Sequence, residues 1–144
     1  MQKYIKFSIE NFIKLIKNVK LMRVAIASLG PDLNSLVSPS FGQAPYIIIV
    51  EVENGEIKNY EVYQNPGLIT GKGKGVALAQ FILSKNVDAV VAGQFGGNAY
   101  AILSQSGVKL FSSPPITVKE AAVKAEKGEL PLGIQAGRRG WGWK

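Results

Sequence analysis

YIIIVEVENGEIKNYEVYQ, residues 46–64, decides the fold of this chain. Two runs rich in β-branched and aromatic residues, 46–53 and 57–64, flank the dipeptide Asn54-Gly55. This dipeptide favours a type I′ turn, because both central residues of that turn need a positive φ. The stretch therefore predicts a β-hairpin of two antiparallel strands.

The hairpin stands within an alternating series of strands and helices. Before it, residues 22–28 form an apolar run typical of a buried strand, and residues 29–44 are rich in loop-forming Pro, Asn and Ser. After it, apolar periodicity and capping residues predict three helices and two more strands. The expected elements are a helix over 76–86, a strand over 88–92, a helix over 99–106 capped by Asn98, a strand over 109–112 and a helix from Thr117 to about Lys127.

The sheet expected from this order has five strands. The last two strands each follow a helix, so they should join the sheet in parallel through right-handed crossovers. If the first strand pairs with the strand over 46–53, then all strands except the one over 46–53 point the same way. The loops 29–44, 65–75 and 93–98 then gather at one edge, outside the carboxyl ends of the strands, where open α/β sheets bind ligands.

Cys and His are both absent from the chain. Their absence excludes disulfides, thiolate and imidazole metal ligands, Cys or His nucleophiles, and histidine, the usual general base. Two-metal nucleases need clustered carboxylates, but the first strand has none, and Asp32 and Asp88 are the only aspartates. We therefore expect a binding protein rather than an enzyme, with no catalytic residue and no metal ion held by its own side chains.

The formal net charge of +7 belongs to the two ends of the chain. Residues 1–21 carry five lysines and one glutamate, and residues 138–144 carry three basic residues. Residues 22–137 hold nine basic and nine acidic residues, so the core is neutral. A neutral core lacks the basic face that nucleic-acid binding needs.

The C-terminal residues 131–144 are predicted to be a flexible tail. Trp141 and Trp143, beside Arg138 and Arg139, could stack on nucleic acid. A solvated tail is the favoured interpretation, because so short a segment makes a small platform. Nucleic acid is therefore not an expected partner.

An amphipathic basic helix is predicted for the N-terminal residues 1–21. It could dock on the domain, on a partner chain or on a second copy, lie on a membrane surface, or be an upstream extension of a core that begins at Met22. No apolar run approaches the roughly 18 residues of a membrane helix, and no signal-peptide cleavage site follows, so we expect a cytoplasmic protein without a transmembrane segment. The apolar positions of the helix are Ile5, Ile9, Phe12, Ile13, Ile16 and Val19.

Two glycine-rich segments stand before predicted helices. The segment GKGKG over 71–75 is either an anion cradle of backbone N–H groups with two lysines, or an ordinary flexible loop. It is not a Walker A loop, which needs four residues between its first Gly and Gly-Lys-Ser/Thr. The segment 93–98 is predicted to be a tight turn capped by Asn98, and the same helix end could bind an anion.

Three segments in order carry a family resemblance: residues 22–28 with SPSFGQAPY over 38–46, GKGKG over 71–75, and GQFGGNA over 93–99. Over about residues 22–130 they resemble the dinitrogenase iron–molybdenum cofactor biosynthesis family, the NifX-like and NifB C-terminal-like domains. The resemblance implies a ribonuclease H-like three-layer α/β/α fold. It also implies a five-stranded mixed sheet in the order 3-2-1-4-5 with the second strand antiparallel. The implied role is non-catalytic, as a binding or carrier protein for a metal cluster or its precursor.

The implied cargo is the iron–molybdenum cofactor or an iron–sulfur precursor. Family members often have His or Arg in place of Ser40 and a basic residue in place of Gln43, so this chain lacks that ligand and charge. Sulfido clusters are anionic, so backbone N–H groups and lysines could hold one without direct ligation. The alternative is a protein–protein adaptor or a small-anion-binding domain unrelated to nitrogen fixation. The candidate cofactor-binding residues are Ser28, Ser38, Ser40, Phe41, Gly42, Gln43, Gly71, Lys72, Gly73, Lys74, Gly75, Gly93, Gly97 and Asn98.

Overall fold

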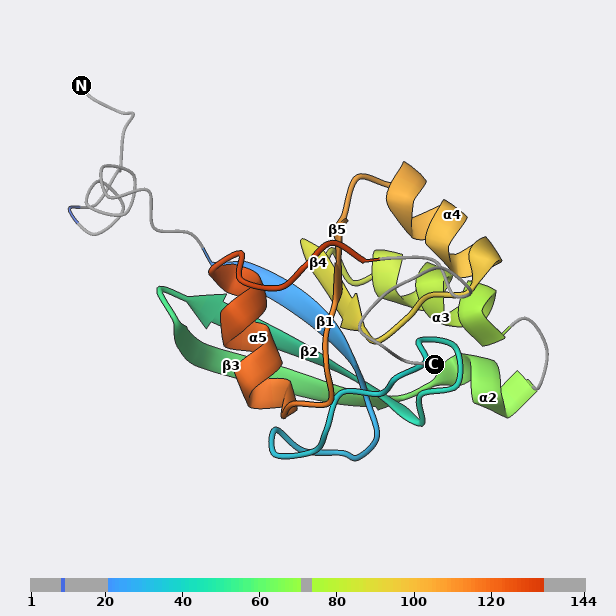
Figure 1. Ribbon diagram of the computed structural model, residues 1–144, viewed down its shortest axis with the longest axis horizontal. Helices are drawn as coiled ribbons and strands as arrows, with labels where there is room; N and C mark the ends of the chain where they lie inside the picture. Colours follow the sequence, from blue (N-terminus) through green and yellow to red (C-terminus); the bar gives the residue numbers. More distant parts are fainter. Residues whose placement is uncertain (1–8, 10–20, 71–73, 134–144) are drawn as a thin grey trace, which may run out of the picture.

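The computed structural model describes residue 9 and residues 21–70 and 74–133 (Figure 1). Within these residues the chain forms an α/β fold around one sheet. The strands are β1 (Met22–Ser28), β2 (Tyr46–Glu53), β3 (Glu56–Gln64), β4 (Ala89–Ala92) and β5 (Lys109–Ser112). The helices are α2 (Pro66–Thr70), α3 (Lys74–Leu83), α4 (Gly97–Gln105) and α5 (Val118–Glu126).

The five strands lie in the order β3-β2-β1-β4-β5, which confirms the predicted order. β2 is antiparallel to both of its neighbours, β1 and β3, whereas β1, β4 and β5 are mutually parallel. β1 therefore lies at the centre of the sheet. β1 and β2 are joined by the long segment 29–45, so β2 and β3 form the tight hairpin that the sequence predicts.

The turn of this hairpin has the predicted conformation. Asn54 has φ 54° and Gly55 has φ 79°, the positive values that a type I′ turn needs. The backbone N–H of Gly55 donates a hydrogen bond of 2.9 Å to the Glu126 carboxylate, which ties the turn to the end of α5. The conformational preferences of Asn54-Gly55 and a long-range hydrogen bond thus stabilise the same turn.

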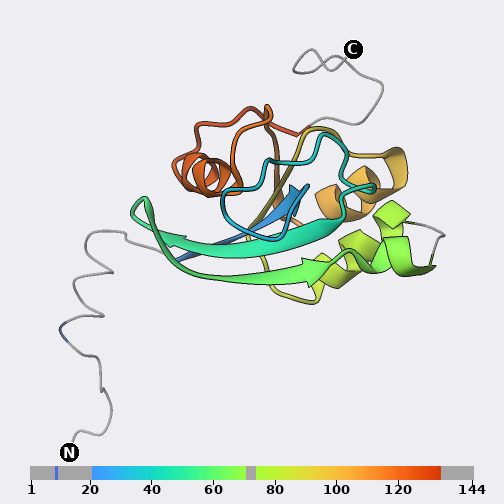
Figure 2. The same cartoon turned by 90° about the horizontal axis from the view of Figure 1, so that it is seen from below.

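Two apolar clusters cover the two faces of the sheet. Alternate residues of β1 supply them, because side chains along a strand point to opposite faces. Ala25 and Ala27 join the cluster formed with α3 and α4, and Val24 and Ile26 join the cluster formed with α5. Figure 2 shows α5 and α3 on opposite sides of the hairpin strands. All four of these β1 side chains are fully buried.

Glycines follow α4 and α5, and a threonine hydroxyl caps the start of α5. Gly107 (φ 91°) and Gly128 (φ 72°) follow the two helices in the left-handed conformation that glycine adopts most easily. The hydroxyl of Thr117 caps α5 by accepting a hydrogen bond of 3.1 Å from the Glu120 N–H, which is one of the two hydrogen bonds of a capping box.

One helix, α2, was not expected. The sequence Asn65-Pro66-Gly67 is typical of a turn, yet Pro66 begins a helical turn, a position that suits its fixed φ. Asn65 is 1% exposed, and its amide nitrogen donates to the carbonyls of Gly42 (3.1 Å) and Ala44 (2.8 Å). The Asn65 Oδ1 also accepts a hydrogen bond of 2.8 Å from the Gly67 N–H, so the same side chain caps the start of α2 and joins it to a distant loop.

Residues 131–133 lie against the sheet, inside the segment for which the sequence predicts a flexible tail. The Ser112 N–H donates to the Pro131 carbonyl (2.9 Å), and the Gly133 N–H donates to the Leu110 carbonyl (2.6 Å). Leu132 forms an antiparallel bridge with Phe111. This short segment covers the outer edge of β5. The rest of the tail and most of the N-terminal segment lie outside the described residues.

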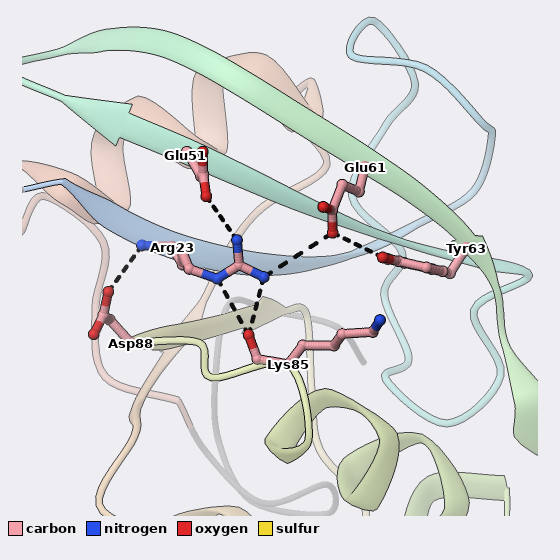
Figure 3. A network of polar contacts seen from close by, with 6 residues as sticks. All are labelled: Arg23, Glu51, Glu61, Tyr63, Lys85 and Asp88. Carbon is pink, nitrogen blue, oxygen red and sulfur yellow. Dashed lines mark hydrogen bonds and ion pairs between the residues drawn. The ribbon is translucent and has the colours of Figure 1, made fainter.

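A polar network joins the first residues of β1 to the turn that follows α3 (Figure 3). The Arg23 guanidinium pairs with Glu51 at 2.6 Å and donates to the Lys85 carbonyl from Nε (3.2 Å) and Nη2 (2.9 Å). The Arg23 N–H donates to the Asp88 carboxylate at 2.9 Å. The Asp88 side chain thus satisfies a backbone N–H at the start of β1. The network lies at the opposite end of β1 from the loop that follows Ser28 and has a structural role.

Candidate functional site

One cleft of about 360 Å³ lies at the carboxyl edge of the central strands. Three segments far apart in sequence line it: the loop after β1, the start of α3, and the β4–α4 connection with the start of α4. Their convergence at this edge is what the topology predicted. The lining residues are Ser40, Gly42, Gln43, Gly75, Val76, Gln94, Gly96, Gly97, Asn98 and Ala99.

The first and third segments are joined by backbone hydrogen bonds. The Gly93 N–H donates to the Ser38 carbonyl (3.0 Å), the Gln94 N–H to the Pro39 carbonyl (2.8 Å), and the Phe41 N–H to the Gln94 carbonyl (3.0 Å). Gly93 is needed for this approach, because a Cβ there would lie 2.6 Å from the Pro39 carbonyl oxygen. The two walls of the cleft therefore form one rigid unit.

Phe41 anchors the loop after β1 in the core. Its side chain is fully buried, and its ring centroid lies 5.2 Å from that of Phe95, the buried residue of the opposite wall. The structure therefore places Phe41 beneath the cleft and not among its lining residues. Ser40, Gly42 and Gln43, on either side of it, do line the cleft.

Ser28 and Ser38 also lie outside the lining. Both are buried, and each hydroxyl bonds to the backbone two residues along: Ser28 donates to the Gly30 carbonyl (2.7 Å), and Ser38 to the Ser40 carbonyl (2.8 Å). These bonds shape the loop from within. Of the predicted loop residues, Ser40, Gly42 and Gln43 remain as those that could touch a ligand.

The start of α4 differs from the sequence prediction. Gly96, not Asn98, occupies the N-cap position, and no side chain caps the helix. The prediction was wrong because glycine is also a good N-cap, so the helix begins earlier than the Asn signal indicates. Asn98 lies in the first turn, where it is exposed and lines the cleft.

The first turn of α4 leaves backbone donors for a ligand. The first intrahelical bond of this turn runs from the Tyr100 N–H to the Gly96 carbonyl (2.8 Å). The preceding N–H groups have no intrahelical acceptor in any α-helix, and here no side chain caps them. They belong to Gly97, Asn98 and Ala99, which all line the cleft. A helix start of this kind favours an anion.

The start of α3 faces the same cleft. Gly75 and Val76 line it, and a Cβ placed on Gly75 would lie 3.3 Å from the Cβ of Ala99 in α4. Two helix starts, each with a partial positive charge, therefore meet at one site. Lys74 is the first residue of α3, whereas Gly71, Lys72 and Gly73 lie outside the described residues.

The lining residues within the described chain carry no ionisable side chain. Their polar groups are the Ser40 hydroxyl and three carboxamides. The sequence analysis did not select Gln94 as a site residue. Its position between the end of a strand and the start of a helix was the signal that could have identified it. The carboxamides belong to Gln43, Gln94 and Asn98.

Among the described residues, no three Asp or Glu side chains gather as a possible metal site. Asp32 hydrogen-bonds within its own loop, to the Asn34 N–H at 2.9 Å. Asp88 belongs to the Arg23 network at the other end of β1. Neither of the chain's two aspartates lines the cleft.

Comparison with known proteins assigns the family. The model of the dinitrogenase iron–molybdenum cofactor family matches residues 22–128, so the chain belongs to this family. An uncharacterized protein of Methanocaldococcus jannaschii is 33% identical over 117 residues, which cover 81% of this chain and 95% of that protein. The match begins at Met22, where the core was expected to start.

Solved structures of similar proteins have the same fold. The apo form of the orange protein from Desulfovibrio gigas is 25% identical with a TM-score of 0.69, covering 79% of this chain and 94% of the other. An NMR structure of a Thermotoga protein, provisionally described as a NifB protein, is 36% identical with a TM-score of 0.62, covering 77% and 92%. These TM-scores show that both relatives share the fold over the aligned parts.

Proposed function

We propose that this protein binds or carries an anionic metal cluster of the iron–molybdenum cofactor or iron–sulfur precursor type in the cleft at the carboxyl edge of the sheet. One observation carries the proposal: two helix starts and three carboxamides converge on a cleft without a carboxylate. Membership of the cofactor family supports the choice of cargo. The described part of the chain contains no helix able to cross a membrane.

The cargo is held whole, by hydrogen bonds and electrostatic attraction. Cys and His, the usual protein ligands of iron, are absent from the chain. A cluster whose metals keep their own sulfido or other ligands needs donors and positive potential, which helix starts and carboxamides provide. Because no side chain bonds to the metal, release to an acceptor protein requires no metal–protein bond to break. This fits a carrier better than a storage protein.

The same proposal includes a non-catalytic role, a cytoplasmic location and a ribonuclease H-like three-layer architecture. Helices on both faces of the sheet support that architecture. It also treats residues 22–130 as the cofactor-binding domain and residues 1–21 as a helix that contacts a partner or a second copy.

A small inorganic anion such as molybdate is the competing ligand, since the cleft's donors would suit it too.

The proposal predicts that Asn98→Asp weakens binding of the isolated iron–molybdenum cofactor at least about tenfold. The new carboxylate lies in the first turn of α4 and repels an anion there, while its interaction with the helix dipole stabilises the fold by about 0.3–1 kcal/mol. Anaerobic titration followed by gel filtration and metal analysis measures the first effect, and thermal unfolding the second.

Gln105→Glu is the matched control, since it adds the same charge at the far end of α4, away from the cleft. It should leave the affinity unchanged. Equal affinity of the Asn98→Asp variant and the wild type would contradict the proposed site. Binding of molybdate with no binding of the cluster would favour the small-anion alternative.

A second prediction concerns the lysines of the glycine-rich segment. Replacing both Lys72 and Lys74 by alanine should weaken cluster binding and reduce its dependence on salt, because the segment that precedes the cleft residue Gly75 loses two positive charges. Stability should change by less than about 0.5 kcal/mol, as expected for surface substitutions. Titration at two salt concentrations tests this. Unchanged affinity and salt dependence would leave residues 71–75 as an ordinary loop.

A further inference from the structure

The two edges of the sheet differ in what lies beside them. The edge at β5 is covered by the chain itself, through the hydrogen bonds of residues 131–133. The edge at β3 has a partner strand, β2, on one side only within the described residues. An edge strand directs the N–H and C=O of every second residue outward, where they can pair with another strand.

Only the beginning of β3 carries the features that protect an edge. Glu51 pairs with Asn59 and Val52 pairs with Ile57, so Lys58 is the extra residue of a β-bulge. Bulges and lysines discourage pairing. Lys58 also binds Glu56 at 2.9 Å, and this hydrogen bond raises the pKa of Lys58 above its usual value.

The second half of β3, Tyr60–Gln64, lacks such protection. It pairs regularly with β2 and contains no Lys, Arg, Pro or Gly. Tyr60 (44% exposed) and Val62 (37% exposed) lie on the face that α5 covers elsewhere, opposite the buried Val50 and Ile48 of β2. The apolar face of the sheet therefore continues to an edge that no other described strand covers.

The one charge in this segment is already paired on the other face. The Tyr63 hydroxyl donates to the Glu61 carboxylate at 2.7 Å, and Arg23 lies 4.0 Å from the same carboxylate (Figure 3). A carboxylate that accepts a hydrogen bond and has a cation nearby opposes the approach of another strand less than a free one would. Tyr60–Gln64 thus combines open backbone, exposed apolar side chains and little net charge.

We propose that Tyr60–Gln64 pairs with the same segment of a second copy, antiparallel about a two-fold axis at Val62, so that one sheet continues through the dimer. In this register Val62 lies opposite Val62, Glu61 opposite Tyr63, and Tyr60 opposite Gln64. Two-fold symmetry makes such an interface self-complementary. No like charges meet, whereas an axis at Glu61 would place two carboxylates opposite each other, which destabilises a sheet.

The dimer leaves both cargo clefts free, because no lining residue of the cleft belongs to β3. Pairing of one short segment buries little area, so the dimer is weak and depends on concentration. The inference does not rest on cluster binding. It can hold for a protein whose cleft takes a different ligand.

Sedimentation velocity of the full chain over a range of concentrations tests the dimer. Wild type should show a monomer–dimer equilibrium, and Val62→Lys should raise its dissociation constant at least tenfold. Leu132→Lys is the matched control, because Leu132 is 76% exposed at the opposite edge of the sheet. Loss of the dimer in Phe12→Asp, with Val62→Lys unaffected, would assign it to the N-terminal segment and overturn the proposal.

Cross-linking gives a readout that does not depend on how Val62→Lys folds. The chain has no cysteine, so a single introduced one reports one position. Val62→Cys should form a disulfide-linked dimer on mild oxidation, since symmetry places the two thiols opposite each other. Ser104→Cys, exposed on α4 on the other face of the sheet, should remain monomeric. A monomer at every concentration, or equal cross-linking of the two cysteine variants, would refute the β3 interface.

Discussion

Replacing Gly93 by alanine is expected to destabilise the domain by about 3 kcal/mol or more, which is large for the addition of one methyl group. The new Cβ would lie 2.6 Å from the carbonyl oxygen and 2.7 Å from the Cα of Pro39. Both are backbone atoms, so no side-chain rotation relieves the overlap. The segments 38–41 and 93–95 would have to move apart, with loss of the hydrogen bonds between them.

Urea denaturation of the wild type and the variant measures this loss. Gly96→Ala is the matched control, three residues along the same connection. A Cβ on Gly96 has no other atom within 4 Å, and its φ of −67° suits any residue. The control should cost less than about 1 kcal/mol, through a poorer N-cap. Similar losses in the two variants would mean that the close approach at Gly93 is not what holds the walls together.

Sequence predicted the parts of the fold that local signals specify. Asn54-Gly55 requires positive φ, and the Thr117 capping box satisfies the first N–H groups of α5, so both are evident in a few residues. Periodicity and the handedness of crossovers then restrict the order of the strands. The sequence analysis missed α2 because it interpreted Asn65-Pro66-Gly67 as a turn, whereas Asn65 caps a helix locally through the Gly67 N–H and also binds carbonyls more than twenty residues away.

The candidate site was predictable as a place but not as a set of residues. Open α/β sheets bind ligands outside the carboxyl ends of their strands, so the three loops were expected to meet there. Ser40, Gln43 and Asn98 do line one cleft. Whether a residue faces the cleft depends on packing, which spacing does not show. Ser28 and Ser38 bond inward, whereas Gln94 lines the cleft although no motif marked it.

The Arg23 network shows the same limit elsewhere in the fold. Arg23, Glu51 and Lys85 come from three separate elements, and their meeting depends on the complete sheet. Sequence gave no reason to pair them.

Phe41→Ala should cost about 3–5 kcal/mol, the range for removing a fully buried phenylalanine side chain. Phe41 is 0% exposed and packs against Phe95, which connects the two walls of the cleft through the core. The loop that carries Ser40 and Gln43 would lose its anchor. We therefore expect weaker cluster binding as well, even at temperatures where the variant remains folded, because a mobile wall must be ordered on binding.

Phe41→Leu separates anchoring from ligand contact. Leucine keeps an apolar side chain at the buried position, so stability should fall by less than about 1.5 kcal/mol and cluster affinity should stay within about twofold. If Phe41 instead stacked on the cargo, Phe41→Leu would lose affinity as strongly as Phe41→Ala while remaining stable. Urea denaturation and anaerobic titration of both variants distinguish these outcomes. A loss below about 1 kcal/mol for Phe41→Ala would show that the ring does not anchor the loop.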